Sequence, residues 1–355
     1  FNGYGKFTDP KTIKILGQDS AIIEGKKIII ATGSEPKNIP AFPFDDQRIL
    51  SSTSILNLKK LPESLAIIGG GYIGCEFASC FADYGVEVHI CEALPSLIHS
   101  QGPDLAQTLT SVFETKGISV HTEVFVEGID VEDKGVRVKL KDQPPIHTEL
   151  ALVAVGRTLN TDQIGLEAAG VATDRGAIVV DEKMETNVSG IYAIGDVTGK
   201  WMLAHVASHQ GLVAATNAVG LESQMHYHAV PAVVFTNPEI ATVGYLPEEA
   251  KEKGLPFRSV KYPFSALGKS QAALETEGFV QLVFNPTTGQ IYGGQVIGHE
   301  ASALIAEIAL AVRCELTLED LSETIHAHPT VAEAWLEAAL VANDTPIHFP
   351  PKKRG

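Results

Sequence analysis

The stretch Ser64 to Glu76 constrains the fold more than any other part of the chain. It reads S-L-A-I-I-G-G-G-Y-I-G-C-E, a short apolar run followed by G-x-G-x-x-G at Gly69, Gly71 and Gly74. In a strand that turns into a helix, the first glycine allows the tight turn and the second lets the backbone approach a pyrophosphate. The third lets helix and strand pack closely, and the helix N-terminus presents N–H groups to the phosphates. The sequence therefore predicts a dinucleotide-binding corner, although the glycines alone are also compatible with a plain strand-to-helix turn.

An acidic residue follows the next predicted strand. The run Val86 to Cys91 ends in Glu92, eighteen residues after Gly74. A carboxylate at this place accepts hydrogen bonds from a ribose 2′-OH and repels a 2′-phosphate, so the pattern favours NAD over NADP. A Rossmann-like unit that binds nothing remains the alternative.

Composition excludes several classes of partner. The 355 residues suggest roughly two or three domains, with a net charge of −16 and a single basic cluster at Lys352 to Arg354. That balance argues against nucleic acid and anionic membranes, and no apolar run is long enough to span a bilayer. Four cysteines make no disulfide scaffold and favour a reducing, cytoplasmic setting. The start at Phe1, without Met or a signal peptide, leads us to expect that a longer protein contains this chain.

The pattern of apolar runs predicts an α/β chain in four segments: the end of an α/β unit at 1–35, the dinucleotide unit at 36–157, a return to the first unit at 158–229, and an α+β domain at 230–355. The expected strands are 27–31, 65–68, 86–91, 119–126, 135–141, 150–155, 177–180, 191–194, 232–235, 258–263, 278–284 and 291–297. The expected helices are 103–116, one beginning near 202–205 and running through 215, 302–313 and 332–341. The last four strands are joined by short turns, so we expect them to form an antiparallel sheet.

A second informative motif reads I-H-A-H-P-T-V-A-E, from Ile325 to Glu333. A capping box between Thr330 and Glu333 would start the next helix, and it explains both of these residues. It does not explain His328. A carboxylate near an imidazole fixes its tautomer and favours the imidazolium, which is how an acid/base pair is built, so catalysis and helix capping both stay open.

Cys75 and Cys80 invite a redox-disulfide interpretation that helix geometry excludes. Five residues on a helix correspond to ~140° of rotation and ~7.5 Å of rise, which puts the two Cα atoms roughly 8–9 Å apart. A disulfide needs less than about 7 Å. All four cysteines are therefore expected to be inert packing residues, and no metal site is expected.

With these pieces placed, the chain resembles the pyridine nucleotide-disulfide oxidoreductases, and within them the dihydrolipoamide dehydrogenases. The resemblance runs over nearly the whole chain. It rests on these markers, in order: N-G-Y-G-K-F at 2–7, A-T-G-S-E-P at 31–36, G-G-G-Y-I-G-C-E at 69–76, V-G-R at 155–157, T-N-V-S-G-I-Y-A-I-G-D at 186–196, M-L-A-H at 202–205, F-T-N-P-E-I-A-T-V-G at 235–244 and H-A-H-P-T-V-A-E at 326–333.

The resemblance implies a fold and two cofactors. The fold would be a Rossmann-like NAD domain inserted in the remnant of an FAD domain, followed by a C-terminal dimerisation domain. The residues that it implies as FAD contacts are Gly5, Thr32, Gly33, Ser34, Asp196, Met202, Leu203, Ala204 and His205. Those that it implies for NAD are Gly69, Gly70, Gly71, Tyr72, Ile73, Gly74, Glu76, Glu92, Val126 and Gly156.

The resemblance also implies an activity. His328 matches the family base that exchanges protons with a dithiol substrate, and Glu333 orients it. The implied enzyme is a homodimer that oxidises the dihydrolipoyl groups carried by lipoyl domains of 2-oxo-acid dehydrogenase complexes, by disulfide exchange, flavin reduction and hydride transfer to NAD.

One departure from the family pattern is large. The first G-x-G-x-x-G for FAD and the redox-active C-x-x-x-x-C that follows it are both missing, so the chain as given is not expected to be competent alone. Two alternatives therefore stay open: a noncatalytic NAD-binding or dimerising module, and a flavin NADH oxidase or peroxidase of the same superfamily. The H-P-T-x-x-E segment argues against the second.

Overall fold

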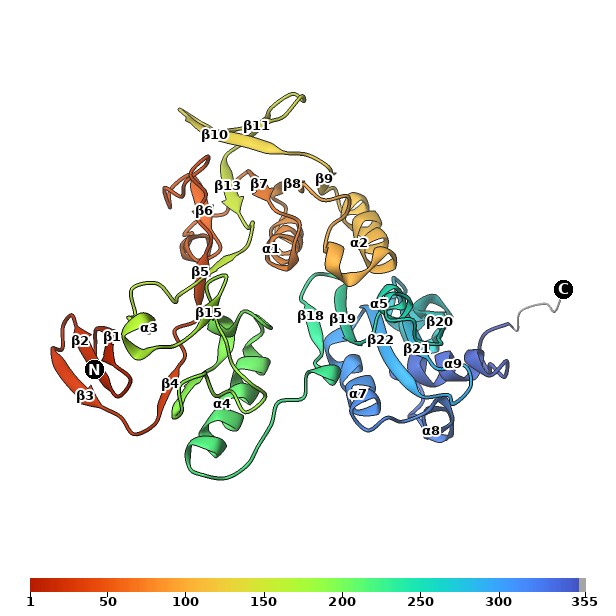
Figure 1. Ribbon diagram of the computed structural model, residues 1–355. Helices are drawn as coiled ribbons and strands as arrows, with labels where there is room; N and C mark the ends of the chain where they lie inside the picture. Colours follow the sequence, from red (N-terminus) through yellow and green to blue (C-terminus); the bar gives the residue numbers. More distant parts are fainter. Residues whose placement is uncertain (351–355) are drawn as a thin grey trace. The chain divides into compact units, whose positions relative to one another are not determined.

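The computed structural model describes residues 1–350 (Figure 1), so the basic cluster Lys352 to Arg354 lies outside the described residues. The chain forms two compact units, each built from two separated stretches. The first combines Phe1–Lys37 with Gly156–Tyr227, and the second combines Asn38–Val155 with the chain from His228 onward. Within residues 1–350, no helix has the length and hydropathy that crossing a bilayer would require.

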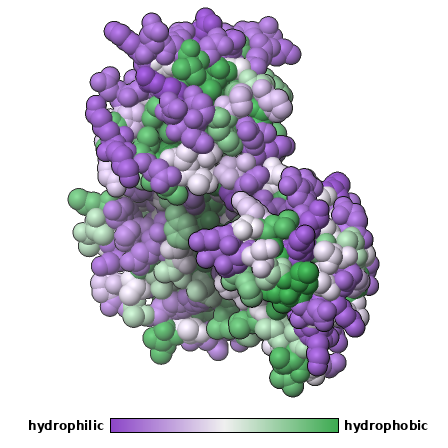
Figure 2. Space-filling model, turned by 90° about the vertical axis from the view of Figure 1, so that its left-hand side faces the viewer, coloured by the Kyte–Doolittle hydropathy of each residue, from purple (hydrophilic) through white to green (hydrophobic). Residues whose placement is uncertain are grey.

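The first unit begins with a small antiparallel sheet that was not among the predicted elements. Its strands are β1 (Tyr4–Asp9), β2 (Thr12–Leu16) and β3 (Ala21–Glu24), in the order β1-β2-β3. Phe7 and Ile15 are its buried side chains, whereas Tyr4 and Ile22 are exposed. Strands with so few buried positions carry no clear apolar alternation, and for that reason the periodicity did not show them. Figure 2, seen from the side where these strands lie in Figure 1, shows hydrophilic and hydrophobic residues intermixed on this face of the molecule.

The rest of the first unit consists of short paired strands and helices. Strand β4, which falls inside the predicted run 27–31, pairs in parallel with β17, and β5 pairs with β14 in antiparallel fashion. The elements are β4 (Ile28–Ile30), β5 (Ser34–Pro36), β14 (Arg157–Leu159), α3 (Leu166–Ala169), β15 (Thr173–Asp174), β16 (Ala177–Ile178), β17 (Ile191–Ala193) and α4 (Ala204–Ala218). A 3₁₀ turn, Gly195–Thr198, follows β17.

The second unit contains a five-stranded parallel sheet in the order β6-β13-β7-β8-β9. Its elements are β6 (Ile49–Ser51), β7 (Ser64–Ile68), α1 (Tyr72–Asp83), β8 (Glu87–Cys91), α2 (Pro103–Thr115), β9 (Ser119–His121) and β13 (Leu150–Val153). Successive strand residues point to opposite faces, so Leu65 and Ile67 pack in one apolar core with residues of α1 and α2. Ala66 and Ile68 pack in a second core with the hairpin strands described next.

That second core is covered by the antiparallel sheet β10 (Val126–Glu132), β11 (Gly135–Leu140) and β12 (Ile146–Thr148), drawn in yellow-green in Figure 1. The prediction of one strand over 119–126 was wrong. Glu123 has a positive φ of 57°, and this left-handed residue separates β9 from β10.

The C-terminal part of the second unit is the predicted antiparallel sheet, in the order β18-β19-β22-β21-β20. Its strands are β18 (Ala232–Val234), β19 (Glu239–Gly244), β20 (Arg258–Pro263), β21 (Phe279–Phe284) and β22 (Ile291–Gly298). Strand β19, which lies between β18 and β22, was not among the predicted strands. The helices are α5 (Pro247–Glu252), α6 (Gly268–Ala273), α7 (Ala301–Arg313), α8 (Leu318–Glu323) and α9 (Glu333–Ala342).

Helices α7 and α9 pack on this sheet, and both contribute to its core. Trp335 of α9 is fully buried, and its indole Nε1 donates to the carbonyl oxygen of Leu304 in α7 at 3.0 Å. This bond satisfies the one polar atom of the indole inside the core. It also links the helix that carries Glu333 to its neighbour.

The connection between α8 and α9 is fixed by His326. Its Nδ1 lies 2.9 Å from the carbonyl oxygen of Thr324, and its Nε2 lies 2.8 Å from Glu307 Oε1. Only the imidazolium can donate from both nitrogens. The bond to Glu307 accordingly raises the pKa of His326 above its ordinary value of 6.5, against the opposing effect of burial.

The raised pKa of His326 makes stability depend on pH. A group whose pKa is higher in the folded state stabilises that state below its unfolded pKa and loses this contribution as the pH rises through its folded pKa. We predict that His326→Gln lowers the free energy of unfolding by about 1.5–3 kcal/mol at pH 6, the range of a hydrogen bond to a charged group, and by less at pH 8. Urea denaturation followed by circular dichroism at both pH values measures this difference. A deficit that grows toward pH 8 would contradict the assignment.

Candidate functional site

The corner between β7 and α1 is shaped by steric limits at two of its glycines. Gly69 has a φ of +108°, and a Cβ placed there would lie 2.4 Å from the carbonyl oxygen of Ala154. A Cβ at Gly74 would lie 1.9 Å from the carbonyl oxygen of Gly69. Both positions therefore exclude any side chain. At Gly71, just before the first residue of α1, a Cβ would meet no atom within 4 Å, so this side of the corner is open to a ligand.

Glu92 is bound to the same corner through both of its carboxylate oxygens. Gly70 N donates to Glu92 Oε2 at 2.6 Å, and Leu94 N donates to Oε1 at 2.7 Å. A carboxylate has about four acceptor sites, so lone pairs remain for a ribose hydroxyl. A Cβ at Gly70 would lie 2.5 Å from Leu97 Cδ2 and 3.2 Å from Glu92 Oε2. The glycine at this position thus lets the backbone approach Glu92.

A pocket of about 280 Å³ opens at this corner. It is lined by Gly70, Gly71, Tyr72, Glu92, Leu94, Ser96, Ile98, His99 and Ser100. Backbone N–H groups at a helix start together with a fixed carboxylate suit the pyrophosphate and ribose of NAD, so these residues fit that cofactor.

The loop from Ser96 to Ser100 was not among the sequence-predicted site residues. It is held over the corner because Ile98 N donates to the carbonyl oxygen of Gly70 at 2.8 Å, and because the Tyr72 hydroxyl lies 2.9 Å from Ser100 Oγ. No sequence spacing predicts that this loop lies at the site, because its contacts depend on the turn that Ile98 makes at a positive φ of 38°.

The remaining NAD candidates lie in different places. Ile73 and Glu76 are in α1, and Glu76 Oε1 accepts a hydrogen bond from Phe235 N at 2.9 Å. Burial raises the pKa of Glu76 above its ordinary value. Val126 begins β10, two residues after Val124, whose N donates to the carbonyl oxygen of Glu92 at 2.9 Å. Gly156, with a φ of +121°, belongs to the other compact unit.

Two of the FAD candidates meet in the first unit. Ser34 Oγ donates to Asp196 Oδ2 at 2.5 Å. Arg157 Nε donates to Ser34 Oγ at 2.6 Å, and an Arg157 terminal nitrogen donates to the carbonyl oxygen of Ser34 at 2.7 Å. Arg157 was not a predicted site residue, and its place in the V-G-R marker at 155–157 was the only sequence feature that pointed to a role in the site. A carboxylate beside a hydroxyl suits the hydroxyl-rich ribityl chain of FAD.

The neighbouring turn is fixed as well. Thr32 Oγ1 donates to the carbonyl oxygen of Asn160 at 2.7 Å, and Asn160 Nδ2 donates back to the carbonyl oxygen of Thr32 at 3.0 Å. Gly33 has a φ of +71° with open space at its Cβ position. The backbone at the Thr32 to Ser34 turn is therefore open to a ligand, as an FAD contact would require.

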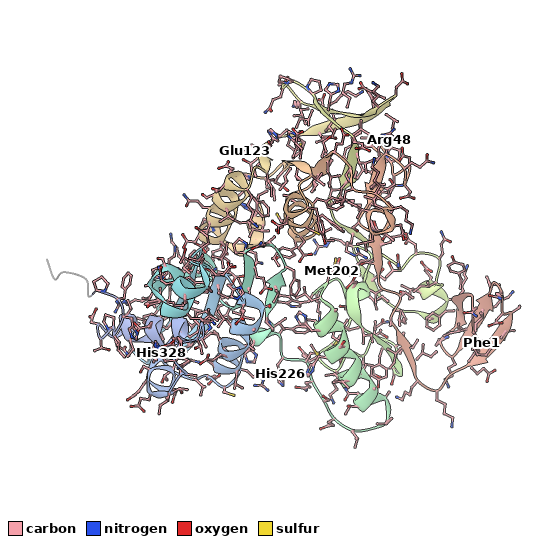
Figure 3. The ribbon with its side chains drawn as sticks, turned by 180° about the vertical axis from the view of Figure 1, so that it is seen from behind. Phe1, Arg48, Glu123, Met202, His226 and His328 are labelled. Carbon is pink, nitrogen blue, oxygen red and sulfur yellow. The ribbon has the colours of Figure 1, made fainter. Side chains whose placement is uncertain are left out.

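The other FAD candidates are spread over two elements. Gly5 lies on the exposed strand β1. Met202 (Figure 3) is 45% exposed, Leu203 precedes α4, and Ala204 and His205 form the first turn of that helix.

His328 and Glu333 form the predicted pair (Figure 3 labels the histidine). His328 Nδ1 lies 2.9 Å from Glu333 Oε1, and Thr330 N donates to Glu333 Oε2 at 2.9 Å. The imidazole is 66% exposed and the carboxylate only 11%. The predicted capping box is half right: α9 begins at Glu333 after Ala332, and the Thr330 hydroxyl donates instead to the carbonyl oxygen of Ala327 at 2.7 Å.

The electrostatics keep Glu333 ionised. Burial raises the pKa of its carboxyl, but hydrogen bonds from Thr330 N–H and His328 and the charge of His348 outweigh burial, and the net pKa is lowered. An ionised Glu333 holds the proton on Nδ1 of His328 and leaves Nε2 as the basic nitrogen of an exposed ring. This arrangement can take and return a proton.

The two buried cysteines, Cys75 and Cys91, are not activated thiols. All four are free, with Cys75 and Cys91 buried and Cys80 and Cys314 exposed. Burial raises the pKa of the Cys75 thiol, and it raises that of Cys91 to about 12. The expectation that all four are packing residues was wrong for Cys80 and Cys314, because Cys80 lies on the exposed side of α1 and Cys314 lies in the exposed turn that follows α7.

Comparison with known proteins identifies the family. The model described as pyridine nucleotide-disulphide oxidoreductase matches residues 1–211, and that of the dimerisation domain of the same family matches residues 230–339. The dihydrolipoyl dehydrogenase of Chlamydia muridarum is 49% identical over 100% of this chain and 77% of its own length. The corresponding enzyme of Geobacillus stearothermophilus is 42% identical over 98% of this chain and 75% of its own length.

Solved structures agree with these sequence matches. LpdA from Mycobacterium tuberculosis has a TM-score of 0.89 and 30% identity, covering 95% of this chain and 75% of that one. The HOCl-induced flavoprotein disulfide reductase RclA from Escherichia coli has a TM-score of 0.87 and 28% identity, covering 95% of this chain and 78% of that one. The chain therefore belongs to the pyridine nucleotide-disulphide oxidoreductases, a family of FAD- and NAD-using enzymes with a C-terminal dimerisation domain.

Proposed function

We propose that this chain provides the NAD site, part of the FAD site and the acid/base pair of a dihydrolipoyl dehydrogenase, which oxidises protein-bound dihydrolipoyl groups with NAD. The observation that carries the proposal is the His328–Glu333 pair, an exposed imidazole held through Nδ1 at 2.9 Å by a buried carboxylate. The names of relatives at 39–50% identity support the same activity.

The pair would handle the protons of the dithiol. Nε2 of His328 accepts a proton from one thiol, because the thiolate is the nucleophile in disulfide exchange. Glu333 stabilises the resulting imidazolium and keeps the ring oriented, and the same nitrogen returns the proton in the reverse direction. When bound, FAD and NAD supply the transfer of the electron pair as a hydride.

Most of the residues proposed for each cofactor lie in one unit. For NAD these are the glycine corner and Glu92, whose charge disfavours a 2′-phosphate. For FAD they are the Thr32 to Ser34 turn and Asp196, with Arg157 keeping Ser34 in place.

The dithiol step also needs a redox-active cysteine pair, and the four cysteines of this chain are free. We therefore propose that these 355 residues alone do not oxidise a dithiol. The same observation favours a second candidate, a noncatalytic NAD-binding and dimerising module. A colourless protein that binds NADH supports the module, whereas a tightly bound yellow flavin supports the enzyme, and the visible spectrum taken together with the intact mass separates the two.

The proposed enzyme has three kinds of domain and two kinds of partner. The FAD-domain parts are 1–35 and 158–229, the NAD domain is 36–157, and the dimerisation domain is 230–355. The partners are a second copy of the chain and the lipoyl domains of 2-oxo-acid dehydrogenase complexes. The unpaired cysteines support a reducing compartment such as the cytoplasm.

The NAD assignment predicts the effect of Glu92→Gln. The amide keeps an acceptor for a backbone N–H but loses the charge that pairs with the ribose hydroxyls and repels a 2′-phosphate. We expect NADH binding to weaken about tenfold, the value of one charge-assisted hydrogen bond, and the preference for NADH over NADPH to shrink. Calorimetric titration with both nucleotides measures this. Glu114→Gln, on the exposed side of α2, is the matched control, and an unchanged NADH/NADPH ratio in Glu92→Gln would refute the role.

The acid/base assignment predicts the effect of His328→Gln. In the enzyme that carries the redox cysteines, we expect dihydrolipoamide oxidation to fall by about 10²–10⁴, the usual contribution of a general acid or base. Hydride exchange between NADH and a nucleotide analogue needs no thiol proton and should change little. Stopped-flow and steady-state assays measure the two steps separately, and equal loss in both would refute the role of the histidine.

A further inference from the structure

Helix α9 carries a second buried carboxylate that the proposed function leaves unexplained. Glu337 lies one turn after Glu333 and is 1% exposed. A buried carboxylate is costly unless it is paired and hydrogen-bonded, so its partner defines its role.

That partner is His348, six residues past the end of α9. His348 Nδ1 lies 2.9 Å from Glu337 Oε1, and His348 N donates to Glu337 Oε2 at 3.3 Å. Both carboxylate oxygens thus bind the same residue. The segment is held at two further points: Thr345 N donates to the carbonyl oxygen of Leu340 at 2.9 Å, and the Phe349 ring lies 5.6 Å from that of Tyr262.

The His348 ring lies beside His328. The two ring planes are within 14° of parallel, and their centroids are 6.2 Å apart. Each imidazole points Nδ1 at a glutamate, and the two glutamates occupy successive turns of α9. The result is an ordered row, Glu333–His328–His348–Glu337.

We infer that Glu337 and His348 are positioning residues for His328: the buried carboxylate fixes the His348 ring, and that ring limits the orientations open to the His328 imidazole. His328 is 66% exposed, and within residues 1–350 its ring has one hydrogen bond, at Nδ1, so it can pivot about that bond. A parallel ring on one side restricts the pivot and keeps Nε2 facing in one direction. The inference rests on the proposed function for its catalytic meaning and not for its geometry.

A variant series separates this role from simple docking of the segment. His348→Ala removes both ring and donor, and His348→Asn removes the ring but keeps an amide that can donate to Glu337. Glu337→Gln removes the charge that fixes the ring. Phe349→Ala loosens the segment at Tyr262 and leaves the histidine row intact, which makes it the matched control.

The readout is the ring N–H proton of His328 that bonds Glu333, followed by nuclear magnetic resonance of the histidine-labelled chain. We expect both His348 variants and Glu337→Gln to broaden this signal and speed its exchange at least about tenfold, as local opening becomes easier. The Phe349→Ala protein should retain it. The ring protons of His326, bonded to Glu307 and Thr324, serve as an internal standard and should not change.

Three results would overturn the inference: an unchanged His328 signal in the His348 variants, an equal effect of Phe349→Ala, or equal loss of the His326 signal. In the enzyme that carries the redox cysteines, the same variants should lower kcat for dihydrolipoamide by about tenfold, below the full contribution of the base, with KM changed less than about twofold. If the proton signal responds but no variant, nor the parent, oxidises dihydrolipoamide, the positioning holds and the proposed function fails.

Discussion

The nucleotide corner depends on one steric constraint, the contact between the start of α1 and the end of β7. The Cβ position of Gly74 lies 1.9 Å from the carbonyl oxygen of Gly69, so helix and strand meet at a distance that only glycine allows. This contact aims the first turn of α1 at the open side of Gly71. The pocket at this open side is lined by the N-terminus of α1, Glu92 and the loop that ends at Ser100.

Carboxylates held by backbone N–H groups recur at the candidate sites of the second unit. Glu92 accepts from Gly70 N and Leu94 N, Glu333 from Thr330 N, and Glu337 from His348 N. A backbone donor cannot rotate away as a side chain can, so each carboxylate is fixed before it meets a ligand or an imidazole. Fixing the charge in advance removes the cost of ordering it when the substrate arrives.

How far the sequence predicted these sites depended on the range of the interactions. The glycine spacing and the His328 to Glu333 spacing are local, so the residues that make each contact lie within a few positions of one another and can be read together. Arg157 and Ser34 are 123 residues apart in the sequence, and neither residue type nor spacing predicts that they form a hydrogen bond. The strands β1 to β3 stayed invisible for a different reason, because a sheet that is solvated on most of its surface has no apolar period to detect.

The row of two glutamates and two histidines shows why motif recognition stops short of the whole site. The motif contains His328 and Glu333, which it places five residues apart, and it says nothing of Glu337, whose partner arrives only after the helix has ended and the chain has turned back. A glutamate on the apolar face of a helix does not fit the amphipathic pattern, and its burial is explained only when its partner is known. Glu337 is only 1% exposed, and an unpaired carboxylate at that depth would destabilise α9 and with it the position of Glu333. The fold must therefore hold His348 against Glu337.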